Sequence, residues 1–375
     1  MIKPLTSLRF FFALLVFCRH VDFVKQHSFP LVNWVITHVF PEGYIGVSFF
    51  FILSGFILAY TYQQKIIEKK TSPKAFMIAR FARIYPMHIL SFLLAFPLAY
   101  KFITSGETPY WTAKLAANLL LIQSFFSDPL TYFSFNGVSW SISDEMFFYA
   151  MFPLIMLGFA ATGKKIWLYA LAAACIAIPV CVYFNGNPFN EFLFYINPLF
   201  RLVDFSLGIL VYNIFRQIRE ERITPFTANM LELGSMVLLA IFFQYHELVP
   251  QNYRFACYYW LPMCLLIFAF AFQKGLVSRL ISYRFFIILG EISFSFYLLH
   301  QIMIRYFFSV NKRMYDPIER DYYMFFVILL VSLGLSYLAH RFIEMPANVY
   351  LKKKLLPKKT REKELNMQKY STTNG

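Results

Sequence analysis

The sequence predicts an all-α fold: a polytopic integral membrane bundle of about ten transmembrane helices, with one further short re-entrant or interfacial helix. Of the 375 residues, 59% are hydrophobic and only 15% are charged. A soluble domain carries about 25% charged residues, so this chain cannot cover a core of its size with polar groups. The composition therefore excludes a soluble enzyme, a disordered chain, a nucleic-acid-binding module and a disulfide scaffold.

Ten apolar runs are long enough to cross a bilayer, which takes about 20 residues. They start near residues 5, 44, 84, 145, 166, 199, 230, 255, 285 and 322. The run from Leu115 to Phe126 has only twelve residues, so it is predicted to be the re-entrant or interfacial helix. The first run is followed directly by Arg19 and His20 without a small-residue cleavage site, which predicts a retained span rather than a signal peptide.

The net charge of +15 is interpreted as a topology signal, because basic residues collect on the cytoplasmic side of membrane proteins. Segments 63–83, 216–229 and 273–284 and the C-terminal tail are all basic. With ten spans these segments lie on one side, whereas an eleventh span would separate the first loop from the tail. We therefore expect no nucleic-acid partner, two cytoplasmic termini, a membrane domain at residues 1–346 and a basic tail at 347–375.

The spacing of cysteines and histidines gives no sign of a metal site. The five cysteines lie in or beside apolar runs without a CxxC pair, so they are interpreted as packing residues. No two of the seven histidines stand three to five residues apart, and the sequence contains no HExxH, GxSxG or nucleotide-binding glycine loop. We expect acid–base catalysis or transport, with no metal and no bound cofactor.

Ionisable residues inside apolar runs are functional candidates, because burying them in a bilayer costs several kcal/mol unless they are paired or hydrated. Arg9 in the first run and His20 just after it are eleven residues apart, so they face the same side of one helix with an axial separation of about 16 Å. The alternative interpretation makes Arg9 a cytoplasmic anchor and His20 an interfacial residue.

Arg80 and Arg83 come just before the third apolar run, and their spacing places both guanidinium groups on one helix face at its cytoplasmic mouth. Two forked donors on one face suit a phosphate or pyrophosphate group. A positive-inside anchor has the same spacing, so both interpretations stay open at this point.

Two further clusters carry polar side chains into apolar runs. Ser141, Glu145 and Tyr149 recur every four residues and share a helix face. The alternative is that Ser141 or Ser143 and the acids Asp144 and Glu145 cap the helix. His300 is expected deep in the ninth run, either as a functional group or as a neutral histidine satisfied by hydrogen bonds. Segment 342–346 is interpreted as a structural helix stop before the tail.

Five motifs occur in an order that resembles the bacterial membrane acyltransferase-3 family, whose members O-acetylate cell-envelope polysaccharides. The resemblance runs from about residue 5 to residue 346. Its motifs are the Arg9–His20 pair, SFFFILSGFIL (48–58), ARFARIYP (79–86), WSISDEMFFY (140–149) and ISFSFYLLH (292–300). Each motif alone is weak, but five of them in order are quite specific.

The resemblance implies transfer of an acyl group, in the simplest case acetyl, from cytoplasmic acyl-CoA (acetyl-CoA) to a glycan hydroxyl beyond the bacterial cytoplasmic (inner) membrane. Its partners would be the donor, a lipopolysaccharide O-antigen, exopolysaccharide or lipid-linked glycan, and the lipid bilayer. Motif by motif, it implies that His20, Glu145 and Arg9 are catalytic and that Arg80 and Arg83 bind the donor. The residues implied to support the site or bind substrate are Ser141, Tyr149 and His300.

One departure from the family concerns its carboxylates. Many members carry two adjacent glutamates where this chain has Glu145 followed by Met146, so Glu145 would act alone and orient or charge-stabilise His20. Direct transfer with His20 as base and a covalent acyl-histidine both stay open. The competing functions are a transporter or flippase, which no inverted repeat supports, and a regulatory protein that has lost catalysis, which the intact motif residues oppose.

Overall fold

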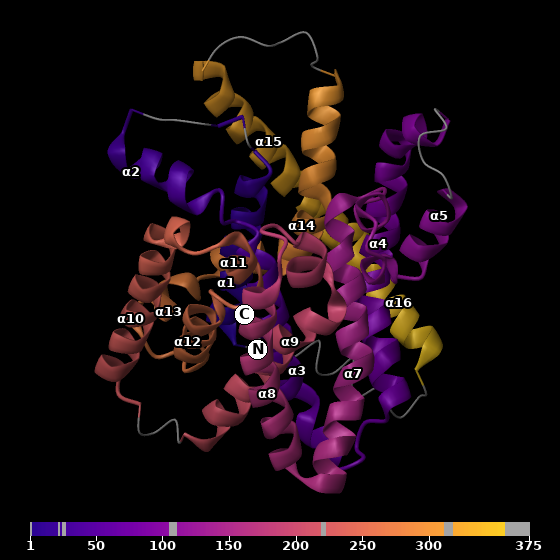
Figure 1. Ribbon diagram of the computed structural model, residues 1–375. Coiled ribbons are helices and arrows are strands. Elements are labelled where there is room, and N and C mark those ends of the chain that lie inside the picture. The colour runs from indigo at the N-terminus through magenta and orange to yellow at the C-terminus, as the bar shows by residue number, and fades with distance from the viewer. Residues whose placement is uncertain are drawn as a thin grey trace.

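The computed structural model describes residues 2–21, 23–24, 28–104, 111–218, 223–310 and 318–356, and in these segments every regular element is a helix (Figure 1). The long helices are α1 (Lys3–Arg19), α3 (Ile45–Ile67), α4 (Pro73–Thr104), α7 (Trp140–Thr162), α8 (Lys164–Phe184), α9 (Pro198–Gln217), α10 (Pro225–Gln244), α12 (Trp260–Ala271), α14 (Arg284–Val310) and α15 (Ile318–Ala339). The shorter ones are α2 (Pro30–Trp34), α5 (Trp111–Leu119), α6 (Pro129–Tyr132), α11 (Gln251–Ala256), α13 (Leu276–Ile281) and α16 (Met345–Leu355). The predicted all-α class is confirmed.

Within the described residues, nine helical stretches are long and apolar enough to cross a membrane. They are Ile45–Ile67, Pro73–Ala99, Gly137–Thr162, Lys164–Phe184, Phe192–Gln217, Pro225–Gln244, Gln251–Ala271, Arg284–Ser309 and Tyr322–Leu355. Helix α1, with 17 residues, is slightly shorter than a typical span. These nine stretches and α1 correspond to the ten predicted runs, so the chain is a multi-pass membrane protein.

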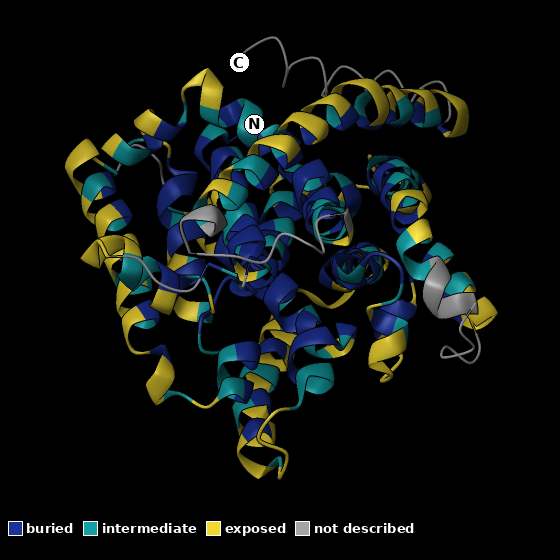
Figure 2. Cartoon of the chain, turned by 90° about the horizontal axis from the view of Figure 1, so that it is seen from above, coloured by how far each residue is buried: buried dark blue, intermediate teal, exposed yellow. Residues whose placement is uncertain are grey.

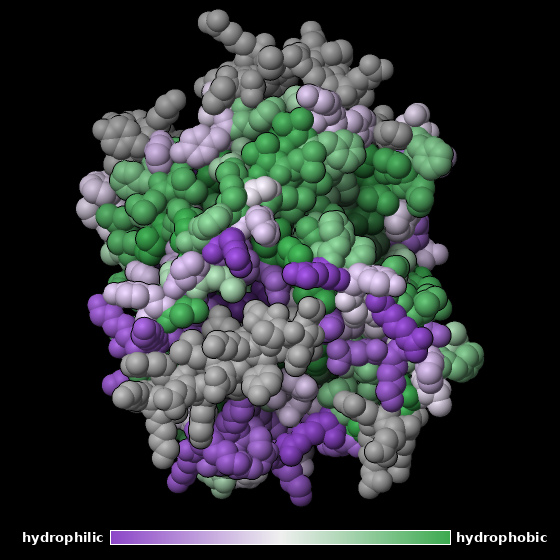
Figure 3. All heavy atoms as spheres, turned by 180° about the vertical axis from the view of Figure 1, so that it is seen from behind, coloured by the Kyte–Doolittle hydropathy of each residue, from purple (hydrophilic) through white to green (hydrophobic). Residues whose placement is uncertain are grey.

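Side chains sort by polarity as a bilayer requires. Seen from above, buried residues occupy the centre of the bundle and exposed ones its periphery (Figure 2). Large hydrophobic side chains such as Tyr183, Phe184 and Phe226 are exposed, and Figure 3 shows hydrophobic atoms gathered over a broad area with hydrophilic atoms collected below it. In water such a patch would aggregate, whereas lipid tails solvate it.

The short run at 115–126 does not form a spanning helix. It consists of the end of α5 and a 3₁₀ turn at Gln123–Phe125. Its irregular backbone is satisfied by neighbours: Ser143 Oγ of α7 donates to the Leu121 carbonyl at 2.8 Å, and His88 Nε2 of α4 contacts the Asn118 carbonyl at 2.9 Å. Non-helical backbone is tolerated at membrane depth only where protein groups complete its hydrogen bonds in this way.

Helix α3 lies at the centre of the bundle and packs most extensively against α9. A Cβ atom on Gly55 would lie 1.9 Å from the Phe205 carbonyl oxygen, and one on Gly208 would lie 1.9 Å from the Ile52 carbonyl oxygen. The two backbones therefore cross with almost no side chain between them. Small residues allow this close approach, which is the main source of packing energy between membrane helices.

Glycines of neighbouring helices also hold α1 in place. A Cβ on Gly46 of α3 would lie 2.5 Å from the Phe12 carbonyl oxygen, and one on Gly290 of α14 would lie 2.1 Å from the Thr6 carbonyl oxygen. Helix α1 is thus packed closely between α3 and α14. Because Arg9 and His20 both belong to this region of the chain, their positions depend on these two contacts.

A buried ion pair links the three helices α3, α9 and α11. Arg201 of α9 pairs with Asp204 at 2.7 Å, donates to Ser48 Oγ of α3 at 2.6 Å and donates to the Phe255 carbonyl of α11 at 3.0 Å. Arg201 is 2% exposed and Asp204 is 1% exposed. A lone charge at this depth would be costly, so these partners make the arginine tolerable within the bundle.

The helix stop expected at 342–346 is wrong. After α15 a π-turn at His340–Glu344 leads directly into α16. Pro346 lies in the first turn of α16, directly after the π-turn, so the helical path continues through the proline. The boundary expected at residue 346 stays a prediction, and residues 357–375 of the expected tail lie outside the described part of the chain.

Replacing Gly208 with alanine should push α3 and α9 apart, because the new Cβ would overlap the Ile52 carbonyl. Overpacking of this kind costs about 1–3 kcal/mol, so the melting temperature in detergent should fall by several degrees. Gly234→Ala in α10 is the matched control, since a Cβ there meets nothing within 4 Å. Equal melting temperatures for the two variants would contradict the close crossing.

Candidate active site

A cavity of about 920 Å³ is lined by α1, α3, α4, α7, α14 and the segment from α15 to α16. Six residues singled out from the sequence line it: Arg9, Arg80, Arg83, Ser141, Glu145 and Tyr149. The expected shared faces, of the two arginines on α4 and of the three polar residues on α7, are therefore seen in the structure. Three helices that are distant in sequence, α1, α4 and α7, bring these side chains together.

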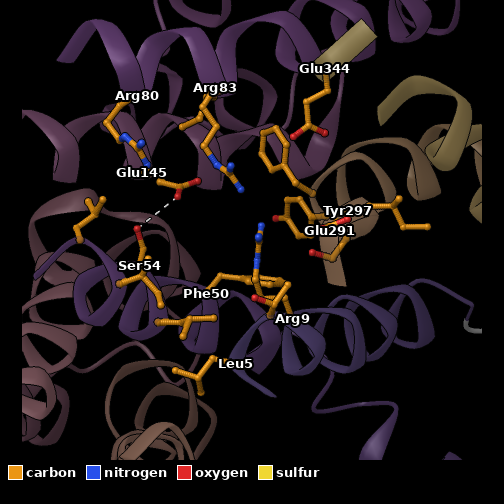
Figure 4. Close-up of a pocket in the computed structure, with 18 of the residues that line it drawn as sticks. Leu5, Arg9, Phe50, Ser54, Arg80, Arg83, Glu145, Glu291, Tyr297 and Glu344 are labelled. Carbon is orange, nitrogen blue, oxygen red and sulfur yellow. Dashed lines mark hydrogen bonds between the residues drawn. The ribbon is translucent and has the colours of Figure 1, made fainter. Parts of the chain in front are cut away.

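The α4 arginines enter the cavity differently. Arg80 Nη2 donates to the Tyr62 hydroxyl at 3.2 Å, and its guanidinium lies 5.2 Å from the centre of the Tyr62 ring. This hydrogen bond and cation–π contact hold Arg80 against α3. Figure 4 shows Arg83 of α4 and Arg9 of α1 pointing toward one another across the cavity. Two facing guanidinium groups create a strong local preference for an anion.

Glu145 is held by two hydroxyl groups. Tyr149 OH, one helical turn along α7, donates to Glu145 Oε1 at 2.5 Å. Ser54 Oγ of α3 donates to the same oxygen at 3.4 Å, as the dashed line in Figure 4 marks. Ser141 instead contacts Tyr297 of α14, with 2.7 Å between the two hydroxyl oxygens. Two of the three motif residues, Glu145 and Tyr149, therefore contact each other, whereas Ser141 contacts Tyr297 elsewhere in the same cavity.

Glu344 is a cavity residue that the sequence interpretation missed. Its Oε2 accepts from Ser295 Oγ at 2.7 Å and lies 2.9 Å from His340 Nδ1. Glu344 is 4% exposed, and Figure 4 shows its carboxylate to the right of Arg83, directed toward the cavity. Segment 342–346 was interpreted as structural, although an acid four residues after a histidine in an apolar run is a signal that could have identified it.

The cavity is basic overall. Its acidic lining residues are Glu145, Glu291 and Glu344. Its basic lining residues are Arg9, Lys65, Arg80, Arg83, Arg284, Arg341 and Lys352. The excess of cations in a site walled by apolar helices would attract a multiply charged anion, because the low dielectric strengthens the field. Within the described residues, no three His, Cys, Asp or Glu side chains gather to hold a metal ion.

His20 and His300 form a pair outside this cavity. His20 Nδ1 lies 3.0 Å from His300 Nε2. His300 is fully buried, and its ring lies within 6.2 Å of the ring centres of Phe17, Phe296 and Tyr297. Neither histidine belongs to the cavity lining.

The cavity and the histidine pair are neighbours across an aromatic wall. Tyr297 lines the cavity while its ring centre lies 6.0 Å from that of His300. Phe50 packs edge-on against Tyr297 with 5.9 Å between ring centres. Tyr297 therefore contacts both the cavity and the histidine pair.

Glu145 was expected to orient His20, but among the described contacts the two side chains have other partners. The structure pairs His20 with His300, whereas Glu145 contacts Tyr149 and Ser54. The sequence could not reveal this, because the answer depends on how α1, α7 and α14 rotate about their own axes.

Comparison with known proteins identifies the class. A family profile described as an acyltransferase domain matches residues 4–341. Acyltransferase MdmB of Streptomyces mycarofaciens is 36% identical over 324 residues, which cover 81% of this chain and 79% of that protein. Putative acetyltransferase ORF330 of Acidianus two-tailed virus is 26% identical over 266 residues, covering 71% and 74% of the two chains.

A more distant relative is the putative O-acetyltransferase SACOL0978 of Staphylococcus aureus (strain COL). It is 23% identical over 327 residues, which are 81% of this chain and 52% of that protein. No solved structure matches the chain.

The fold and the cavity define a multi-pass membrane protein with a site suited to an anionic molecule. The chain belongs to the acyltransferase-3 family, and it is an O-acyltransferase that uses an acyl donor. The resemblance noted from the five motifs is confirmed over nearly the whole chain.

Tyr62 offers a test of how Arg80 is held. Tyr62→Phe keeps the ring under the guanidinium and removes the hydroxyl acceptor, so KM for the acyl donor should rise about 3- to 10-fold with kcat nearly unchanged. Tyr62→Leu also removes the cation–π contact and should raise KM by a further factor of about 3. Steady-state kinetics of the purified enzyme measures both. A wild-type KM in the leucine variant would contradict this role.

Proposed function

We propose that this enzyme transfers an acyl group, in the simplest case acetyl, from cytoplasmic acyl-CoA to a hydroxyl of a cell-envelope glycan such as an O-antigen or exopolysaccharide sugar. In this proposal it lies in the bacterial cytoplasmic membrane with both termini in the cytoplasm. The observation that carries the proposal is the basic cavity that ends at an aromatic wall beside His20 and His300.

The charges of the cavity support an acyl-CoA donor. CoA has a diphosphate and a further phosphate at one end and a long thin arm bearing the thioester at the other. Arg80 and Arg83 would bind phosphate oxygens with charge-assisted, forked hydrogen bonds. Arg9 faces Arg83 from α1 and would stabilise negative charge in the cavity. The arm would then extend past Phe50 and Tyr297 toward the histidines.

The chemistry falls to His20 in this proposal. His20 accepts the proton of the acceptor hydroxyl while the hydroxyl oxygen attacks the thioester carbonyl carbon. The resulting tetrahedral intermediate collapses, the carbon–sulfur bond breaks, and the departing CoA thiolate takes the proton back from the imidazolium. The products are an O-acyl ester and free CoA. In the covalent variant His20 itself takes the acyl group and passes it to the hydroxyl.

Glu145 acts at the donor end of this arrangement. Its carboxylate is anchored by Tyr149 and Ser54 and lines the cavity together with Arg80 and Arg83. An anchored carboxylate would keep the cavity's cations oriented and limit their mutual repulsion. We therefore assign Glu145 to electrostatic organisation of the cavity rather than to direct contact with His20.

Substitutions should separate binding from chemistry. His20→Ala, in protein that still inserts into the membrane, should lower kcat by at least about 100-fold and leave acyl-CoA binding intact. Arg80→Ala and Arg83→Ala should each raise the Kd for acyl-CoA by about 10- to 100-fold, as expected for loss of a charge-assisted hydrogen bond. Release of free CoA and titration calorimetry in nanodiscs measure the two effects.

Arg279→Ala is the matched control, because Arg279 is exposed at the end of α13 and does not line the cavity. Its donor affinity should equal that of the wild type. Retained turnover in His20→Ala would refute the role of His20, and unchanged donor affinity in both arginine variants would refute the donor site.

The acceptor is tested in cells. Deleting the gene that encodes the protein should remove one class of ester-linked acyl group from purified envelope glycans. NMR of the glycans measures these ester groups. Re-expression of the wild type should restore that ester, and His20→Ala should not. Identical ester content in the deletion strain would contradict a glycan acceptor.

A further inference from the structure

The histidine pair has a geometry that determines where its protons lie. His300 Nδ1 lies 3.2 Å from the Phe296 carbonyl oxygen, one helical turn back in α14. Its other ring nitrogen, Nε2, lies 3.0 Å from His20 Nδ1. Both nitrogens of His300 are therefore engaged, one by a group that can only accept and the other by a second imidazole.

The direction of each hydrogen bond follows from the donors and acceptors available. A carbonyl oxygen only accepts, so His300 Nδ1 must carry a proton. A neutral imidazole has one N–H and one lone pair, so His300 Nε2 is then the acceptor and His20 Nδ1 is the donor. The reverse arrangement would turn the lone pair of His300 Nδ1 toward the Phe296 carbonyl oxygen, which is repulsive in a buried site.

We propose that His300 is a positioning residue: by accepting the hydrogen bond from His20 Nδ1, it places the lone pair of neutral His20 on Nε2, the nitrogen that acts as base. This inference rests on the proposed function of His20. The Phe296 carbonyl, His300 and His20 then form a chain of two hydrogen bonds that specifies one tautomer.

Packing around His300 makes this chain rigid. His300 is fully buried, with the rings of Phe17 and Phe296 beside it. The same turn of α14 is held by Asn136, whose Nδ2 donates to the Leu298 carbonyl at 3.0 Å. A base held in one orientation loses less entropy when the reaction begins.

A neutral histidine is a suitable positioning group at this place. In many hydrolases a carboxylate orients the catalytic histidine, but an extra charge within a membrane bundle is costly. Imidazole accepts the same hydrogen bond without a charge in the resting enzyme. When His20 takes up the hydroxyl proton, its Nδ1–H can share the new positive charge with His300 Nε2, and both atoms return to the resting pattern once CoA leaves.

The test compares His300→Gln with His300→Leu in nanodiscs. Glutamine retains a side-chain oxygen that can accept from His20 Nδ1, whereas leucine has no acceptor. His300→Leu should lower kcat about 100-fold or more and leave KM for acyl-CoA within about 3-fold, and His300→Gln should recover at least about 10-fold of that loss. His300→Leu turnover close to that of the wild type, or no rescue by glutamine in a folded variant, would overturn the proposal.

His246→Leu is the matched control for loss of a buried histidine. His246 is 3% exposed, its Nδ1 lies 2.7 Å from the Phe243 carbonyl, and it lies outside the cavity. The thermal stability of the His246→Leu variant reports the cost of removing a buried imidazole from its carbonyl partner. The kcat of this variant should match that of the wild type.

A spectroscopic measurement is independent of turnover and of whether the His300 variants fold. In wild-type protein labelled with 15N-histidine, the signal absent from the His20→Gln variant should show neutral His20 protonated at Nδ1. Protonation at Nε2 would overturn the inference. If the wild type showed this tautomer but released no CoA from acyl-CoA, the proposed function would fail and the proton arrangement would stand.

Discussion

Charged side chains inside a membrane-spanning bundle need partners or water, and this constraint shapes the structure around its cavity. Arg9 and Arg83 face each other across the cavity, and their mutual repulsion is moderated by carboxylates on three other elements (Figure 4). Glu145 and Glu344 are themselves anchored by hydroxyl groups and a histidine. The charged side chains of the cavity are therefore held in fixed positions, and the cavity is preorganised for an anionic ligand.

Close helix packing supplies the rigidity that this arrangement needs. Gly55 and Gly208 let α3 and α9 cross in backbone contact, and Gly46 and Gly290 hold α1 between α3 and α14. These contacts fix the rotation of α1 about its axis. That rotation determines that Arg9 faces the cavity while the chain at His20 meets α14 beyond the aromatic wall. Van der Waals contact between backbones thus positions charged groups that do not touch one another.

Prediction from the sequence succeeded where polar residues recur at helical spacing along a single helix. The spacing of Arg80 and Arg83, and that of Ser141, Glu145 and Tyr149, placed each set on one face, and both sets line the cavity. It failed where the partner comes from elsewhere in the chain. Glu344 depends on Ser295, and His20 on His300; both partners belong to α14, and local periodicity carries no information about such contacts.

The sequence by itself determined that this is a helical membrane protein of about ten spans and a member of the acyltransferase-3 family, because hydrophobic length and ordered motifs are properties of the chain. Only the tertiary structure decided which polar groups meet. Helix rotation and the glycine crossings bring Glu145 to the arginines rather than to His20, and they bring His300 within hydrogen-bonding distance of His20. A hydrogen bond depends on separations of tenths of an ångström, which residue spacing within separate helices does not specify.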